Sequence, residues 1–243
     1  MSRRRGRRID GILLLDKPVG ITSTRALNRA KYVFDARRGG HTGSLDPLAS
    51  GLLPLCFGEA TKISAFLLDA EKRYEVEARL GTATDTADAD GTVNETAAVP
   101  VLDVARVEAV LEKFHGDIEQ IPPMYSALKY RGERLYTLAR KGIIVERQPR
   151  PVTIYKLILR DLGTSSLGLE VHCSKGTYVR TLVEDIARAL GTVGHVSALR
   201  RTGVAGFGSD DPWVTLKALE ADDNPEQWLL EPDAALRQWP AIT

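Results

Sequence analysis

Hydrophobic residues follow two different periods along this chain. In residues 72–80 every second side chain is apolar, which predicts a half-exposed strand; the apolar positions are Tyr74, Val76, Ala78 and Leu80. After residue 178 apolar positions recur three and four residues apart, which predicts a helix; they are Val179, Leu182, Val183, Ile186 and Leu190. Strand and helix patterns therefore occur in the same chain.

Further segments extend this mixture. A short apolar run over residues 11–15 predicts a buried strand that ends at the turn Asp16-Lys17-Pro18-Val19-Gly20. Thr22 or Ser23 caps a predicted helix that continues to about residue 34.

Later in the chain, residues 104–114 have the spacing of an amphipathic helix. Residues 152–162 and 167–173 predict a hairpin, and residues 195–203 predict a closing strand. The sequence predicts a mixed α/β (α+β) fold.

Residues 39–55 show neither period. Glycines at four positions permit unusual backbone angles, and Pro47 pushes Asp46 away from helical geometry. We therefore expect Asp46 on a constrained, extended loop that apolar neighbours hold against the core. A carboxylate on a rigid loop suits nucleophilic or base chemistry, although an Asp-Pro pair is as readily an ordinary turn.

A longer motif surrounds this aspartate. The segment Gly-His-Thr-Gly-Ser-Leu-Asp-Pro-Leu-Ala-Ser-Gly-Leu-Leu-Pro closely resembles the catalytic motif of the bacterial TruB-type tRNA pseudouridine synthases. The resemblance covers about residues 10–240 and includes the segment Ile121-Pro122-Pro123-Met124-Tyr125-Ser126-Ala127-Leu128-Lys129. It implies a large, mainly antiparallel mixed sheet flanked by helices. It also implies an isomerase that converts uridine 55 in the T-loop of tRNA to pseudouridine.

The resemblance implies a role for several side chains. Asp46 matches the aspartate on which the glycosidic-bond rearrangement depends. His41 matches the residue that fills the space left by the flipped base, and Tyr74 matches a tyrosine that stacks on that base. Arg180 matches an arginine that pairs with the catalytic aspartate, and from its position in the sequence we expect it on the charged side of its helix.

Three more positions match the family. Tyr178 corresponds to a tyrosine under the bound nucleotide, Leu199 to an apolar residue of the uracil pocket, and Lys17 to a lysine beside the active site. For two of them there is a simpler alternative in the residues themselves: Leu199 as a core residue and Lys17 as a surface lysine. Core packing is likewise the ordinary role of a tyrosine such as Tyr74.

The charge distribution suggests three regions. The net charge is only +1, but residues 209–243 are strongly acidic and the rest of the chain is basic. We expect a flexible basic arm over residues 1–9, a catalytic domain over residues 10–208, and an acidic segment over residues 209–243 that packs on this domain. A basic insertion at about residues 124–151 is expected to contact RNA, as the family's thumb-like insertion does. The family's usual C-terminal RNA-binding domain is expected to be absent or truncated.

The residues exclude several other chemistries. The four histidines lack metal-ligand spacing, and no phosphate-binding or dinucleotide-binding glycine motif is present, so we expect no metal and no cofactor. Two distant cysteines and no recognisable export signal favour a cytoplasmic location, and we expect a monomer whose partner is the tRNA T-arm. A non-catalytic RNA-binding module and an isomerase of another RNA uridine are the competing interpretations.

Overall fold

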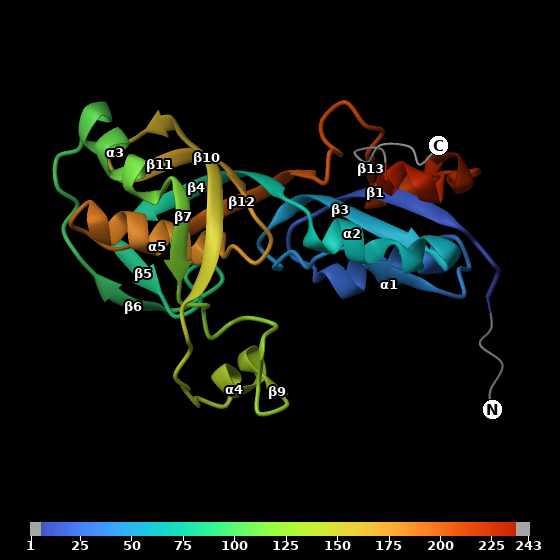
Figure 1. Cartoon of the computed structure of the whole chain (residues 1–243), viewed down its shortest axis with the longest axis horizontal. Helices are drawn as coiled ribbons and strands as arrows, with labels where there is room; N and C mark the ends of the chain where they lie inside the picture. Colours follow the sequence, from blue (N-terminus) through green and yellow to red (C-terminus); the bar gives the residue numbers. More distant parts are fainter. Residues whose placement is uncertain (1–5, 237–243) are drawn as a thin grey trace. The chain divides into compact units, whose positions relative to one another are not determined.

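The computed structural model describes residues 6–236 of the 243-residue chain (Figure 1). The chain divides into two compact units. Unit 1 consists of residues 1–74 and 200–243, and unit 2 consists of residues 75–199. Two strands, β4 (Lys72–Leu80) and β12 (Gly194–Val204), have residues in both units. Within residues 6–236, no helix is long and apolar enough to cross a membrane.

Unit 1 contains a sheet with the strand order β13-β1-β3-β12, in which β14 also pairs with β1 and β2 with β3. The β1–β13 and β3–β12 pairs are parallel, and the other pairs of this unit are antiparallel. Its own elements are β1 (Gly11–Lys17), β2 (Gly39–His41), β3 (Ser50–Phe57), β13 (Val214–Thr215), β14 (Leu229–Leu230), α1 (Ser23–Val33), α2 (Ser64–Asp69) and α6 (Leu216–Ala221).

Strand β3 corrects the expectation that residues 39–55 have no regular structure. Seven of its eight residues are buried, and its residues 51–57 pair with the similarly buried β1. A strand buried on both faces is apolar at successive positions, so its sequence lacks the alternation that marks a half-exposed strand. Only the stretch between β2 and β3, which contains Asp46, is irregular.

The ends of the chain are tied into unit 1 as far as they are described. The acidic C-terminal segment supplies β13, α6 and β14, which lie beside β1 and α1. The expected basic arm falls partly outside the described residues. Of its remainder, Arg7 is hydrogen-bonded through its backbone to Asp35 and Arg37, and Ile9 is buried. Residues 7–9 therefore differ from the flexible arm that their charge had suggested.

Unit 2 contains the strand order β12-β4-β11-β10-β7, with an antiparallel hairpin between β10 and β11. Helix α5 lies across these strands and against α3 (Figure 1). Its own elements are β5 (Thr82–Thr84), β6 (Val93–Thr96), β7 (Gly116–Gln120), β8 (Lys129–Tyr130), β9 (Glu133–Arg134), β10 (Arg150–Leu162), β11 (Ser166–Cys173), α3 (Val104–Leu111), α4 (Leu135–Arg140) and α5 (Val179–Ala189).

The basic insertion forms a small lobe beyond the ends of β7 and β10 (Figure 1). It consists of the β8–β9 hairpin and helix α4, which is anchored by the buried side chains of Leu135 and Leu138. The guanidinium groups of Arg134 and Arg140 lie 5.9 and 5.6 Å from the ring centre of Tyr136. The lobe therefore combines cationic and aromatic side chains.

The mixed α/β fold with a large, mainly antiparallel sheet and flanking helices is confirmed. The domain limits expected from sequence stay a prediction, and the division into compact units follows other boundaries. A single domain was expected over residues 10–208, whereas the chain leaves unit 1 after Tyr74 and returns to it at Arg200. Composition does not change at either point, because both lie inside continuous strands.

Candidate active site

The loop that carries Asp46 is fixed by the first residue of helix α1. The Ser23 hydroxyl accepts a hydrogen bond from the backbone N–H of Leu45 at 2.7 Å and donates one to its carbonyl at 3.0 Å. Ser23 is 3% exposed, so both backbone groups are satisfied away from water. On the other side of Leu45, the carbonyl of Asp46 accepts a hydrogen bond from the N–H of Ala49. The carboxylate-bearing residue is therefore held on a defined backbone.

Lys17 supports this loop from the neighbouring turn. Its ammonium group donates to the carbonyls of Pro18 and Ile21 at 2.9 and 2.8 Å, and the Gly20 N–H donates to the carbonyl of Pro47 at 2.8 Å. Its side chain is fully buried, which excludes the alternative of an ordinary surface lysine. Lys17 thus stabilises the turn that contacts the residue after Asp46.

His41 and Tyr74 are linked to a buried arginine in unit 1. Arg201 donates from Nε to the carbonyl of Leu52 at 2.7 Å and from Nη2 to the carbonyl of Gly43 at 3.2 Å, and it hydrogen-bonds the Tyr74 side chain. Burial lowers the pKa of His41, and the positive charge of Arg201 lowers it further. His41 is therefore held in its neutral form at neutral pH.

In unit 2, the Arg180 side chain contacts two segments that lie far apart in the sequence. Its guanidinium donates to the carbonyl of Thr86 at 2.7 Å and to that of Tyr125 at 2.8 Å, and it lies 3.7 Å from the carboxylate of Asp88. The side chain is buried, so the expectation that it lies on the charged side of its helix was wrong. The polar contacts offset the cost of burying this cation.

Asp88 in turn organises the polar turn between β5 and β6. Its carboxylate accepts hydrogen bonds from the Thr86 hydroxyl at 2.6 Å and the Asp90 N–H at 3.1 Å, and its carbonyl accepts one from the Thr84 hydroxyl at 2.6 Å. This turn belongs to the polar segment of residues 82–91. Its polar residues build a cradle for Arg180.

Tyr178 and Leu199 are also placed in unit 2. The amide of the buried Gln120 brackets the backbone of Tyr178, accepting from its N–H at 3.0 Å and donating to its carbonyl at 3.3 Å. Tyr178 is the residue immediately before α5, so Gln120 fixes the start of the helix that carries Arg180. Leu199 is buried near the middle of β12, which is compatible with both a core and a pocket-lining role.

One carboxyl beside Arg180 has an unusual acidity. Burial raises the pKa of Glu184 to about 7, with a further contribution from the neighbouring Asp185. The positive charges of Arg188, Arg180 and Arg147 act in the opposite direction. Glu184 is therefore close to half-protonated near neutral pH.

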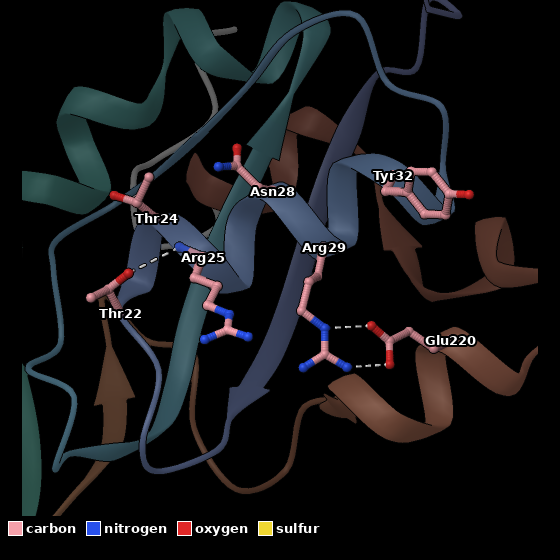
Figure 2. A pocket seen from close by; sticks show the side chains of 7 residues that line it. All are labelled: Thr22, Thr24, Arg25, Asn28, Arg29, Tyr32 and Glu220. Atoms are coloured by element: carbon pink, nitrogen blue, oxygen red, sulfur yellow. Dashed lines mark hydrogen bonds and ion pairs between the residues drawn. The ribbon is translucent and has the colours of Figure 1, made fainter.

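A surface pocket of about 430 Å³ lies elsewhere in unit 1, between α1 and α6 (Figure 2). Arg29 and Glu220 form a two-pronged ion pair at its side, and Thr22 accepts a hydrogen bond from the Arg25 N–H. None of the expected site residues lines it. The pocket is therefore separate from the residues to which the sequence assigned chemistry.

The expected residues thus fall into two groups. Lys17, His41, Asp46 and Tyr74 belong to unit 1, and the other three belong to unit 2.

Sequence reasoning missed three supporting side chains: Ser23, Gln120 and Arg201. Ser23 was considered only as a helix cap, and nothing in the sequence marks Gln120. Arg201 had a detectable signal, because residues two apart on a strand share a face and Leu199 was expected in either the uracil pocket or the core.

Solved structures identify the class of fold. This chain superposes on a chain in the crystal structure of a Cbf5-Nop10-Gar1 complex with a TM-score of 0.74 and 26% identity, covering 93% of this chain and 61% of that chain. An H/ACA RNP bound to a substrate RNA containing 2′-deoxyuridine gives a TM-score of 0.70 at 23% identity, covering 93% of this chain and 60% of that chain, which supports the fold alone. The fold is that of a pseudouridine synthase.

Sequence comparison defines the family. Residues 31–179 match the N-terminal domain of the TruB family of pseudouridylate synthases, and residues 180–237 match the C-terminal domain of tRNA pseudouridylate synthase B. The chain therefore belongs to the TruB family, as its central motif had indicated.

Curated relatives agree with this assignment. A protein of Nitrosococcus oceani named tRNA pseudouridine synthase B is 57% identical over 242 residues, covering 98% of this chain and 78% of the relative. A protein of Shigella boydii with the same name is 52% identical, covering 95% of this chain and 75% of the relative. Membership in an enzyme family of RNA isomerases is therefore established on near-complete coverage of the chain.

Proposed function

We propose that this protein converts uridine 55 in the T-loop of tRNA to pseudouridine. The observation that carries the proposal is the loop of Asp46, which Ser23 fixes at both polar backbone groups of Leu45 and which lies in the family's catalytic motif. The names of the close relatives supply the substrate class. The family resemblance supplies the particular uridine.

The reaction moves one base without changing the composition of the RNA. The bond between N1 of uracil and C1′ of ribose breaks, the base turns, and a bond forms between C5 and C1′. C5 loses its hydrogen and N1 gains one, so the product is an isomer and no oxidant or reductant is consumed. The carboxylate of Asp46 is the group proposed to assist the cleavage and re-formation of the glycosidic bond.

The target base must leave the stack of the T-loop before it can react, at a cost of roughly a few kcal/mol. We propose that neutral His41 occupies the space that the base vacates. A neutral imidazole is suited to this role because it can stack and hydrogen-bond without bringing a second charge near Asp46. Tyr74, Tyr178 and Leu199 are proposed to contact the flipped nucleotide through aromatic and apolar surface.

The basic insertion is proposed to hold the RNA. Between Lys129 and Arg150 it carries seven cationic residues and two glutamates, and exposed arginines lie beside Tyr130 and Tyr136. Cations bind phosphates and tyrosine rings stack on unpaired bases, so both features of RNA are matched. Three further expectations stay predictions. They are that Arg180 pairs with Asp46, that the protein acts as a monomer, and that it is located in the cytoplasm.

Release of tritium tests the isomerase. The purified protein is incubated with T-arm RNA labelled with tritium at C5 of uracil, and release is expected because formation of the C5–C1′ bond expels that hydrogen. Asp46→Asn should abolish release while leaving RNA binding intact. The matched control is Asp10→Asn, because Asp10 is a carboxylate of the same unit that accepts a hydrogen bond from the Glu59 N–H; this variant should release tritium at the wild-type rate.

Two outcomes would overturn the proposal. RNA binding without tritium release by the wild-type protein would favour the non-catalytic RNA-binding module. Release from an RNA that lacks the T-loop uridine would assign the enzyme to another uridine.

A further inference from the structure

The buried Arg201 carries an inference that rests on the proposed function and extends it. Arg201 lies on β12, pairs with Gly51 of β3, and is 1% exposed. Among the residues that the structure describes, it makes no ion pair with a carboxylate. Burying a cation without a counter-ion is unfavourable, and this cost is offset here by hydrogen bonds to uncharged groups.

These hydrogen bonds connect three segments that carry site residues. Nη2 of Arg201 donates to the carbonyl of Gly43, which lies between His41 and Asp46 in the sequence. Nε of Arg201 donates to the carbonyl of Leu52, on the strand that follows the loop. The third contact is the hydrogen bond with the side chain of Tyr74. A guanidinium is suited to this arrangement because its planar fork presents several N–H donors in fixed directions.

We infer that Arg201 is a positioning residue, which fixes the Tyr74 ring and the backbone between His41 and Asp46 in the geometry that the reaction requires. It acts through these residues rather than by touching the substrate. Catalytic groups must be held within a few tenths of an ångström, so loss of such a support lowers the rate even when the fold survives.

The charge of Arg201 has a second effect, on His41. Among the described residues, the charge that acts on this histidine in this way is that of Arg201 from β12. Two other cations lie near its neighbours in the chain: the Lys31 side chain from α1 comes within 3.3 Å of the position a Cβ would take on Gly39, and the Lys72 side chain from β4 comes within 4.0 Å of that position on Gly43. Opposite His41, β3 presents the apolar Leu55. Removing the Arg201 charge should therefore raise the pKa of His41, and replacing it with another cation should not.

Three variants separate positioning from charge. Arg201→Met removes both the fork and the charge, Arg201→Lys keeps the charge without the fork, and Arg200→Met is the matched control. The Arg200 guanidinium instead pairs with Asp16 at 3.0 and 2.8 Å and lies over the ring of Trp213. The assay is tritium release from labelled T-arm RNA as a function of pH, with the fold checked by circular dichroism and His41 followed by NMR titration.

We expect kcat to fall about tenfold or more in both Arg201 variants, with KM changed far less, because RNA binding involves other surfaces. The acid limb of the pH profile and the NMR midpoint of His41 should move to higher pH in Arg201→Met and stay near wild type in Arg201→Lys. Arg200→Met should retain kcat. If Arg201→Met does not fold, the test is the comparison of kcat between Arg201→Lys and the control Arg200→Met.

Equal loss of kcat in Arg200→Met and Arg201→Met, or wild-type kcat in Arg201→Lys, would overturn the inference. Absence of tritium release from the wild-type protein would instead contradict the proposed function. In that case a wild-type His41 midpoint in folded Arg201→Met would still show that the arginine does not act on this histidine.

Discussion

Replacing Ser23 with alanine should release the backbone on which Asp46 is carried. The change removes one hydroxyl that makes two hydrogen bonds, at 2.7 and 3.0 Å, to the N–H and carbonyl of Leu45. Both Ser23 and Leu45 are buried, so water cannot readily replace the lost partner. Each unsatisfied buried backbone group costs about 1–3 kcal/mol, and we expect the free energy of unfolding to fall by about 2–4 kcal/mol.

The adjacent Thr22 provides a matched control. Thr22 is the N-cap of α1, and its exposed hydroxyl accepts from the Arg25 N–H at 3.1 Å (Figure 2). Thr22→Ala should cost about 1 kcal/mol of stability through the lost cap. Among the described residues, the Thr22 hydroxyl bonds the Arg25 N–H and not the Asp46 loop, so tritium release should proceed at the wild-type rate.

Urea denaturation and tritium release, measured on both variants at a temperature where each is folded, check this reasoning. We expect Ser23→Ala to lower kcat well below that of Thr22→Ala, with similar KM values. If Ser23→Ala unfolds at the urea concentration of the wild type, or if the two variants have the same kcat, then Ser23 does not hold the loop and the account of its two hydrogen bonds is refuted.

Two further predictions concern stability. Glu184→Gln should raise the free energy of unfolding by about 1 kcal/mol at pH 8, after allowance for its partial exposure, and leave it unchanged at pH 4. The sign follows because the folded pKa of about 7 lies above the ordinary value of 4.5, so native stability falls as pH rises from 4.5 to 7; urea melts that show the same gain at both pH values would contradict it. Gly51→Ala should destabilise by about 2 kcal/mol or more, since φ is +97° and a Cβ would lie 2.3 Å from the carbonyl oxygen of Arg201. Gly40→Ala, where a Cβ would meet nothing within 4 Å, should stay within about 0.5 kcal/mol of wild type, and equal melting of the two variants would refute the steric argument.

Local pattern determined the elements with the clearest period. The strand predicted over residues 72–80 is β4 without a change of bounds, and the helix predicted after residue 178 is α5. Each period arises within a single strand or helix that has one face against the core. It can therefore be recognised in the sequence before the neighbouring elements are known. The central motif was long enough to indicate the family, which the comparisons confirmed.

The same local reasoning failed where an element is buried on more than one side. Residues 50–57 form a strand between β1 and β12, and their apolar run carries no alternation because both faces are covered. Arg180 was placed on a charged helix face, whereas the Thr86 and Tyr125 carbonyls from distant segments make its burial possible. From sequence alone a charged side chain is expected to be exposed, because the polar groups that would allow its burial are not known.

The sequence by itself determined the types of the elements with a clear period, the mixed α/β fold class and the family motif around Asp46. Only the tertiary structure decided which side chains support the candidate site. Ser23 lies 22 residues before Leu45, and Arg201 lies 158 residues after Gly43, yet hydrogen bonds join each pair. Such partners produce no periodic pattern in the sequence. A hydrogen bond between distant segments depends on which segments the tertiary fold brings together, and not on the spacing of neighbouring residues.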